Sequence, residues 1–97
     1  MWVRLTFTKV DPAKLDEARA FYNSEAISGV IRKQKGYRFH YLLESVANPG
    51  EAISVSAWDS EADGEAYEKS GTYAELVGKF RQWFTAPPEL KSYEVRE

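Results

Sequence analysis

Few residues of this sequence have side chains suited to chemistry, and they are widely spaced. His40 is the only histidine, and the 97 residues include no cysteine. The lack of cysteine excludes disulfides, thiolate metal sites, iron–sulfur clusters and cysteine nucleophiles. With a single histidine and no cysteine, a metal site would have to be built mainly from carboxylates. The only clustered carboxylates lie on the expected surface helices, so we expect no metal site. His40 is a candidate for proton transfer, with a hydrogen-bonded role in a subunit interface as the alternative.

Motifs for covalent catalysis and phosphate binding are also missing. The sequence contains no Ser–His–acid arrangement and no Gly-x-Ser-x-Gly elbow, and its six glycines are scattered. A net charge of −2 argues against a nucleic-acid partner, because no basic stripe could neutralise phosphates. No apolar run approaches the ~20 residues that span a bilayer, so we expect no membrane partner. The alternating N-terminal segment is unlike a signal peptide, which predicts a cytoplasmic protein.

The length of the chain predicts one domain over residues 1–97 with a thin core. A dimer would relieve that thinness by covering a second apolar surface. Aromatic residues make up 14% of the sequence, which is high for a small domain. They could form the core, an interface or the wall of a pocket for a planar ligand.

The polarity pattern of the first third predicts a strand followed by a helix. Residues 2–10 alternate between apolar and polar side chains, as in a half-buried strand. Asp11 can cap the following helix, and Pro12 suits its first position. Weak helix formers over residues 23–29 predict a bend or break there, and Gly36 ends the helix.

The middle of the chain predicts a hairpin. Residues 37–45 and 53–58 alternate in polarity, and the sequence Asn48-Pro49-Gly50 between them is a strong turn signal. Two helices with capping boxes should follow, starting at Ser60 and Thr72.

The end of the chain predicts a helix stop and a last strand. Ala86-Pro87-Pro88 should end the second of these helices, and residues 90–96 should form a short strand. The order strand–helix–strand–strand–helix–strand predicts an α+β, ferredoxin-like βαββαβ fold with a four-stranded antiparallel sheet.

The alternating strands give the sheet two different faces. We expect the helices to cover the more apolar one, which carries Val3, Leu5, Phe7, Phe39, Tyr41, Leu43, Ile53, Val55, Tyr93 and Val95. The other face mixes large apolar and polar groups, namely Trp2, Arg4, Thr6, His40, Leu42, Ser54, Ser56 and Trp58. Packing this second face on another copy would bury its tryptophans, which predicts a homodimer through sheet faces. A monomer with an open sheet is the alternative.

Several segments resemble the antibiotic-biosynthesis-monooxygenase-like group, whose members form dimeric α/β barrels. The likeness covers nearly the whole chain and rests on residues 30–37, Tyr41-Leu42-Leu43, Asn48-Pro49-Gly50-Glu51, residues 57–62, Tyr67-Glu68-Lys69-Ser70, Pro87-Pro88-Glu89 and Tyr93-Glu94-Val95. The resemblance implies a homodimer with a ligand cleft between sheet and helices in each subunit. Activities in the group include metal- and flavin-free oxidation of polyketide-type aromatics, quinol oxidation and haem degradation.

The haem-degrading branch of this group uses an asparagine, a tryptophan and a histidine. The corresponding positions here are Thr6 or Phe7, then Tyr67 and Val77. Without the histidine, haem iron would have no axial ligand there, so we do not expect haem degradation.

The resemblance implies a cofactor-independent monooxygenase acting on a quinol or a polyketide-type aromatic. Such chemistry needs a substrate that ionises, a dry pocket, a base or hydrogen-bond acceptor, and a donor for developing superoxide. The candidates for these roles are Arg4, His40, Tyr67 and Tyr73, and each could instead serve packing or an interface.

Candidates to contact a small aromatic ligand are Tyr22, Trp58 and Trp83. Trp58 could equally anchor the corner between its strand and the next helix, and Trp83 could belong to a buried helical stripe. Because fold does not determine function, a non-catalytic homodimer that binds a small molecule, or has a structural or regulatory role, is the alternative function.

Overall fold

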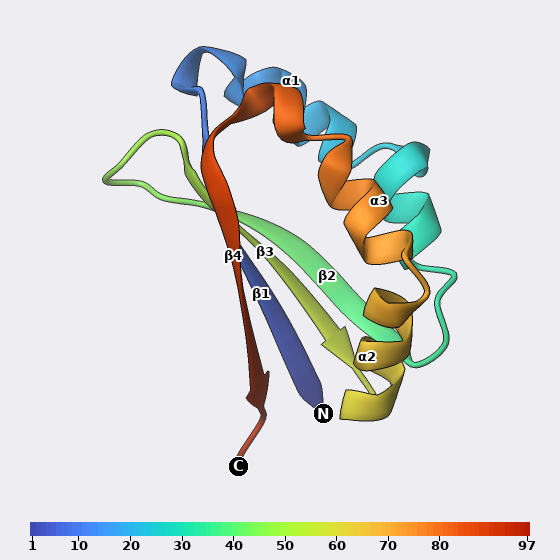
Figure 1. The fold of residues 1–97 in the computed structure, drawn as a ribbon. Coiled ribbons are helices and arrows are strands. Elements are labelled where there is room, and N and C mark those ends of the chain that lie inside the picture. The colour runs from blue at the N-terminus through green and yellow to red at the C-terminus, as the bar shows by residue number, and fades with distance from the viewer.

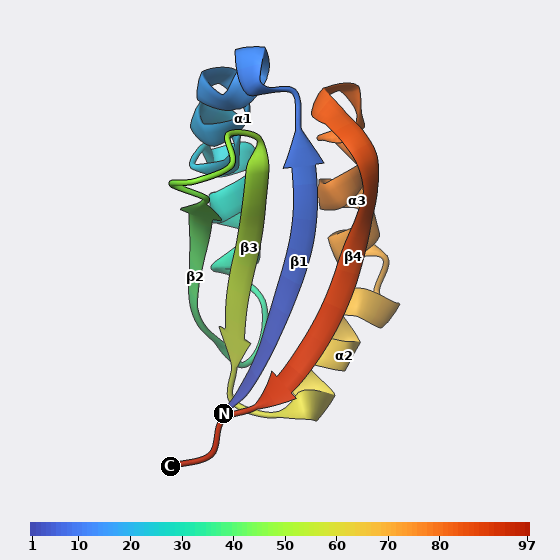
Figure 2. The same cartoon turned by 90° about the vertical axis from the view of Figure 1, so that its left-hand side faces the viewer.

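A computed structural model of residues 1–97 shows one antiparallel sheet with all helices on one of its faces (Figure 1). Figure 2 looks onto the uncovered face, where the strands lie in the order β2-β3-β1-β4. Their bounds are β1 Trp2–Val10, β2 Tyr37–Glu44, β3 Glu51–Trp58 and β4 Phe84–Glu94. Every neighbouring pair is antiparallel, which confirms the predicted ferredoxin-like α+β fold.

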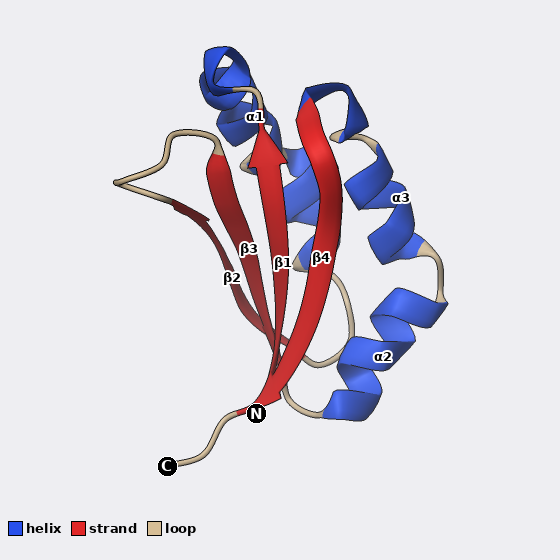
Figure 3. Cartoon of the chain, turned by 60° about the vertical axis from the view of Figure 1, so that its left-hand side comes forward, coloured by secondary structure: helices blue, strands red, loops and turns tan.

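The helices form a single layer behind the sheet (Figure 3). They are η1 Pro12–Lys14, α1 Leu15–Tyr22, η2 Glu25–Gly29, α2 Glu61–Lys69, α3 Thr72–Gly78 and η3 Arg81–Trp83. None of them combines the length and apolar character that crossing a membrane requires.

The predicted start and break of the first helical region are confirmed, but its predicted end at Gly36 is wrong. The Asp11 side chain accepts a hydrogen bond from the Ala13 amide at 3.0 Å. After α1 the backbone widens into the π-helical turn η2, in the segment of weak helix formers. The helix ends at Ile31, and turns lead from there to β2. Gly36 is the last residue of these turns and adopts φ 79°, a left-handed conformation that glycine takes without strain.

The two predicted helix caps in the second half differ in outcome. The Ser60 hydroxyl accepts from the Asp63 amide at 3.2 Å, as expected for a capping box. The predicted cap at Thr72 is wrong, because Thr72 is already the first residue of α3 and Gly71 precedes it with φ 87°. A left-handed glycine turns the chain sharply between α2 and α3, so no side-chain cap is needed for that turn.

The predicted helix stop at residues 86–88 is also wrong, because β4 begins at Phe84 and runs through both prolines. This is possible because β4 is an edge strand, where a missing amide hydrogen need not break the ladder. Pairing with β1 shifts register between Phe7 and Lys9, level with Pro87 and Pro88. At this irregularity the two prolines need not donate a hydrogen bond to β1. As a result, β4 begins six residues before the predicted start at Leu90.

The assignment of sheet faces made from the sequence is inverted in the structure. Arg4 and Thr6 face the helices and are 3% and 5% exposed, whereas Tyr41 on the opposite face is 61% exposed. The helices supply hydrogen-bond partners for the polar groups of the mixed face, which apolar contacts alone could not do. The uncovered surface, called the open face below, carries Glu89 and Lys91 of β4 and the apolar side chains Val3, Leu5, Phe7, Phe39, Tyr41, Leu43, Ile53, Val55 and Tyr93.

The core lies between the sheet and the helices and is rich in aromatic residues. Its buried members are Trp2, Tyr22, Ile27, Ile31, Trp58, Tyr67 and Leu76. Helix α2 approaches β1 closely because Gly64 sits directly against the Trp2 ring, where a Cβ atom would overlap the ring. This contact sets the height of α2 above the sheet.

We expect Gly64→Ala to lower the free energy of unfolding by about 1–3 kcal/mol, the usual cost of overpacking. The Trp2 ring is buried and has little room to move. The gain in helix propensity, up to about 1 kcal/mol, is too small to compensate. Urea unfolding checks this, with Gly78→Ala as the control. A Cβ at Gly78 meets only Arg81 Nε at 4.0 Å, so the control should be neutral or slightly stabilising. Equal effects of the two substitutions would contradict the prediction.

Candidate functional site

A cavity of about 80 Å³ lies between the sheet and the helices α1, α2 and α3. Its wall is mostly hydrophobic and reaches the surface beside the half-exposed pair Arg19 and Glu44. The polar groups elsewhere in the wall are hydroxyls, from Thr6, Thr8, Ser54, Tyr22, Tyr67 and Tyr73. Such a site suits an apolar ligand that carries one or two oxygen atoms.

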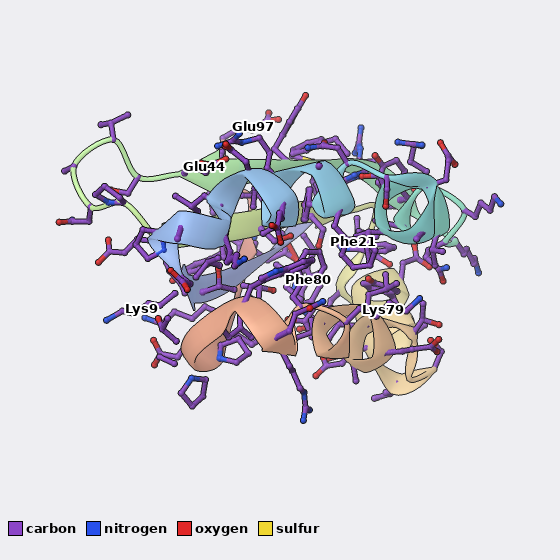
Figure 4. The ribbon with its side chains drawn as sticks, turned by 90° about the horizontal axis from the view of Figure 1, so that it is seen from above. Lys9, Phe21, Glu44, Lys79, Phe80 and Glu97 are labelled. Atoms are coloured by element: carbon purple, nitrogen blue, oxygen red, sulfur yellow. The ribbon has the colours of Figure 1, made fainter.

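Aromatic contacts between α1 and the segment after α3 close the helical side of the cavity. Phe21 and Phe80 meet between these segments, as seen from above in Figure 4, with ring centroids 5.2 Å apart. Trp83 packs against both, at 5.7 Å from each. Phe80 lines the cavity, whereas Trp83 lies outside it and is part of this packing. The sequence had placed Trp83 among the ligand contacts, and the structure gives it no contact with the cavity.

Tyr22 enters the cavity from the last residue of α1, and its hydroxyl is fully used. It donates to the Tyr41 carbonyl at 3.2 Å and so accepts from Ser54 Oγ at 2.8 Å. Burial raises the pKa of Tyr22 to about 12, which keeps the phenol neutral. Tyr22 therefore shapes the wall, as expected for a cleft between the first helix and the sheet.

Tyr73 enters from α3 and is tied to the first strand. Its hydroxyl shares a hydrogen bond with Thr6 Oγ1 at 2.7 Å. Burial raises the pKa of Tyr73, although the bond to Thr6 opposes that shift. This pair bridges helix and sheet at the inner part of the cavity.

Tyr67 enters from α2, and its hydroxyl makes no hydrogen bond to another group of the chain. The ring is held by stacking on Trp58 at 4.9 Å and by an edge contact with Tyr73 at 5.7 Å. Burial, and secondarily the neighbouring phenols of Tyr73 and Tyr22, raise the pKa of Tyr67. Its phenol is thus a neutral, unused donor in the cavity wall. The sequence indicated Tyr67 as a candidate, but it could not show that the Tyr67 hydroxyl stays free while those of Tyr22 and Tyr73 are hydrogen-bonded.

An ion pair that the sequence analysis missed borders the opening of the cavity. Arg19 of α1 donates two hydrogen bonds to the Glu44 carboxylate of β2, at 2.6 and 2.8 Å. It also donates to Asp16 at 2.8 Å. Hydrogen bonding from Arg19 holds the pKa of Glu44 below its usual value, so Glu44 is a weak base. No sequence signal links the two residues, because the pair spans 25 positions and exists only once α1 lies over β2.

His40 lies on the helix side of β2 but outside the cavity wall. Ser28 Oγ donates to the Tyr22 carbonyl at 2.7 Å, so it accepts from His40 Nε2 at 2.8 Å. The other ring nitrogen, Nδ1, then accepts from the Tyr37 hydroxyl at 2.8 Å. His40 therefore fastens the π-helical turn η2 to the sheet, with both nitrogens occupied. It is neither an interface residue on the open face nor positioned to take a proton from a ligand.

Trp58 is fully buried and does not line the cavity. Its indole donates to Ser56 Oγ at 3.0 Å, and its ring supports Tyr67. These contacts agree with the expected anchoring role at the corner between β3 and α2. A ligand in the cavity cannot stack on the Trp58 ring, because the ring is not exposed to the cavity.

Arg4 lies directly behind the cavity wall. Its guanidinium is sandwiched between the rings of Trp2 at 4.9 Å and Tyr73 at 5.1 Å. It donates to Glu68 of α2 at 2.6 Å, while Nε and Nη1 have no partner. Of the four expected catalytic candidates, the structure thus gathers Arg4, Tyr67 and Tyr73 and leaves His40 apart.

The cavity does not fit a haem group. Thr6, Tyr67 and Val77, at the three positions compared with haem-degrading proteins, do lie in the wall, but no histidine does. The chain contains no cluster of three or more histidine, cysteine or acidic residues that could hold a metal ion.

Comparison with known proteins gives a consistent result for the fold. Residues 1–79 match the family described as Antibiotic biosynthesis monooxygenase. Similar solved structures include a candidate antibiotic biosynthesis monooxygenase from Deinococcus radiodurans (TM-score 0.80, 13% identity, covering 100% of this chain and 94% of that one). Two others come from Mycobacterium tuberculosis. Rv0793 has a TM-score of 0.77 and 18% identity, and the match covers 99% of this chain and 95% of that one. The haem degrader MhuD, with two haems bound in its active site, has a TM-score of 0.78 and 18% identity, and the match covers 98% of this chain and 95% of that one. No curated protein sequence matches significantly.

The environment of His40 predicts a pH dependence of stability. Burial, and secondarily the charge of Arg32, lower the pKa of His40 in the folded state below its unfolded value of about 6.5. Below that pH the unfolded chain binds a proton that the folded chain resists, so stability falls as the pH drops towards the folded pKa. We expect urea midpoints to decrease between about pH 7.5 and 5.5 in the wild type, and less in His40→Gln, whose amide can keep both hydrogen bonds. Parallel pH profiles would contradict this origin.

Proposed function

The chain belongs to the antibiotic biosynthesis monooxygenase family, and from that premise we propose a cofactor-independent monooxygenase that oxidises a small quinol or related phenolic compound. The observation that supports this most directly is the free hydroxyl of Tyr67 in a mostly hydrophobic cavity wall. A neutral phenol in such surroundings can donate a hydrogen bond to an oxygen atom that gains negative charge.

The reaction proceeds through an ionised substrate. The substrate anion gives one electron to dioxygen, which yields a substrate radical and superoxide. Their combination forms a carbon–oxygen bond and a peroxide anion, and protonation followed by loss of water leaves a carbonyl. One oxygen atom enters the product and the other leaves as water. Tyr67 donates a hydrogen bond to the reduced oxygen during these steps, and the apolar wall excludes competing water.

The cavity contains no effective general base. Tyr22 and Tyr67 are neutral donors, and Glu44 is a weak base because Arg19 hydrogen-bonds to it. His40 is outside the wall. The substrate must therefore be acidic enough to ionise with little help, which favours quinols and enolisable aromatics over simple arenes.

The size of the cavity limits the substrate further. A volume of about 80 Å³ is below the ~150 Å³ of an apolar cavity that holds benzene and far below the ~300–1,000 Å³ of ordinary ligand sites. A single ring enters only if the opening beside Arg19 widens. A fused polyketide-type ring system also needs α3 to move away from α1, which breaks the Phe21–Phe80 contact.

A non-catalytic binding protein is the second candidate function. The missing base and the small cavity favour it, because binding an apolar molecule needs neither proton transfer nor oxygen access. Oxygen uptake with simple quinols and anthrone-like compounds separates the two. Uptake no faster than with heat-denatured protein would leave only the binding function for those substrates.

The protein also forms a homodimer in this proposal, through its open face. Apolar side chains from β1, β2 and β3 lie uncovered there, with Leu43 48% and Tyr41 61% exposed. A contiguous apolar surface of this kind is rare on a monomer, and a second copy would cover it. The interface is the opposite face from the one expected from the sequence. The predicted cytoplasmic location stays part of the proposal.

We expect Tyr67→Phe to reduce kcat/KM for quinol oxidation by about 10²–10³-fold, the usual effect of removing one donor to a developing anion. The lost hydroxyl has no partner in the chain, so the thermal midpoint should hardly change. Oxygen-electrode kinetics measures the effect. Tyr93→Phe, on the open face, is the matched control and should keep wild-type rates. Equal rates for both variants would remove Tyr67 from the mechanism.

We expect light scattering at micromolar concentration to give about twice the chain mass of 11.1 kDa. Val55→Asp places a charge at the centre of the open face and should shift the mass to that of one chain. Val46→Asp introduces the same charge on the fully exposed hairpin loop and should leave the mass unchanged. A wild-type mass near 11.1 kDa would rule out the dimer.

A further inference from the structure

The entrance of the cavity is bordered by the only two charged side chains of its wall. Arg19 of α1 and Glu44 of β2 line the cavity there, and their side chains are 46% and 29% exposed. Figure 4 shows Glu44 at the edge of the sheet beside α1. The rest of the wall consists of aliphatic and aromatic side chains and hydroxyls. Additional room in the cavity is therefore gained most easily when these two flexible side chains turn out into solvent.

Arg19 and Glu44 form one of two polar links between α1 and the sheet. The Glu44 carboxylate accepts hydrogen bonds from Arg19 Nε at 2.6 Å and Nη2 at 2.8 Å. The other link lies at the end of α1, where the Tyr22 hydroxyl bonds to the Tyr41 carbonyl and to Ser54 Oγ. Because Tyr22 is buried, its link can hold α1 in place while the link at the entrance opens.

Arg19 has a second carboxylate within reach on its own helix. Its Nη1 donates to Asp16, one turn earlier in α1, at 2.8 Å. When Glu44 turns away, Arg19 therefore keeps an ionic partner, and the Glu44 carboxylate becomes hydrated at the sheet edge. An ion pair between partly exposed groups contributes little to stability, because solvent screens it. The pair at the entrance can thus open at small cost, unlike a buried ion pair.

We propose that the Arg19–Glu44 pair is a latch that determines which ligands the cavity admits. In the closed state the volume of about 80 Å³ is too small for an aromatic ring. In the open state Arg19 pairs with Asp16 alone, and a neutral single-ring ligand uses the space that the two side chains leave. The inference rests on the proposed function only in taking the cavity as the ligand site, and it needs no turnover.

A latch of this kind lowers the affinity for a ring. The bound ring holds the latch open, so the ion pair stabilises only the free protein. Apparent affinity is then reduced by the fraction of molecules in which the latch is open. Weakening the pair should strengthen binding, and strengthening the pair should weaken it.

The test measures binding of 4-(dimethylamino)benzonitrile to the full-length protein. This neutral single-ring compound fluoresces more strongly in apolar surroundings than in water. Glu44→Gln keeps the shape of the side chain and removes its charge, so affinity should rise about two- to fivefold, as expected for a partly exposed ion pair. Asp16→Asn leaves Glu44 as the only ionic partner of Arg19, so affinity should fall by about twofold.

Glu25→Gln is the matched control. It breaks the pair between Arg32 and Glu25, which is also exposed and has an N–O distance of 3.0 Å, but neither residue lines the cavity. This variant should bind the compound as the wild type does. Added salt screens the latch, so between about 0.02 and 0.3 M salt the affinity should rise more in the wild type than in Glu44→Gln. Comparing the two proteins cancels any effect of salt on the compound itself.

A second measurement observes the latch directly. In the NMR spectrum of isotope-labelled protein, the Arg19 Nε–H signal reports the hydrogen bond to Glu44, and its loss in Arg19→Lys assigns it. Saturation with the compound should move this signal in the wild type towards its position in Glu44→Gln.

Equal affinities of the wild type and Glu44→Gln would overturn the inference. So would a bound compound that leaves the Arg19 signal in place, or a lack of binding to all of these proteins. The outcome is independent of catalysis. Latch-dependent binding without oxygen uptake contradicts only the monooxygenase function, and oxygen uptake with latch-independent binding contradicts only the role of Arg19 and Glu44.

Discussion

The helix-covered face of the sheet carries polar groups that must be hydrogen-bonded once buried, and the rest of the structure depends on how the helices provide partners. Tyr73 of α3 bonds Thr6, Glu68 of α2 bonds Arg4, and the π-helical turn presents Ser28 to His40. Each bond joins a helical element to a strand and so determines where that element lies. The widened backbone of η2 has a clear role here, because it brings Ser28 to the sheet.

This arrangement leaves the more apolar face of the sheet without cover in a single chain. Helices that must satisfy Arg4, Thr6 and His40 cannot also pack on Leu5 and Val55, because alternate strand residues point in opposite directions. The open face is then the natural surface for a second copy. Association would add apolar burial to a chain whose own core is thin, as small domains require.

The chemistry of the cavity follows from the same buried hydrogen bonds. They engage the hydroxyls of Tyr22 and Tyr73, occupy both nitrogens of His40, and leave Tyr67 as the free donor. Burial keeps these phenols neutral. The site can therefore stabilise negative charge on a ligand oxygen but has little capacity to remove a proton. In the proposed reaction, the acidity of the substrate takes the place of a general base.

The sequence by itself determined the order of strands and helices, the Asp11 and Ser60 caps, the hairpin and the break after α1, because local propensities and turn residues control these features. It also indicated Tyr22, Tyr67 and Tyr73, but not which hydroxyl stays free. Only the tertiary structure decided which sheet face the helices cover, how β4 passes through two prolines, and where Arg19 meets Glu44. Alternation along a strand divides its residues between the two faces of the sheet. It does not say which of the two faces the helices cover. That choice rests on hydrogen bonds between residues far apart in sequence, which form only when the chain folds.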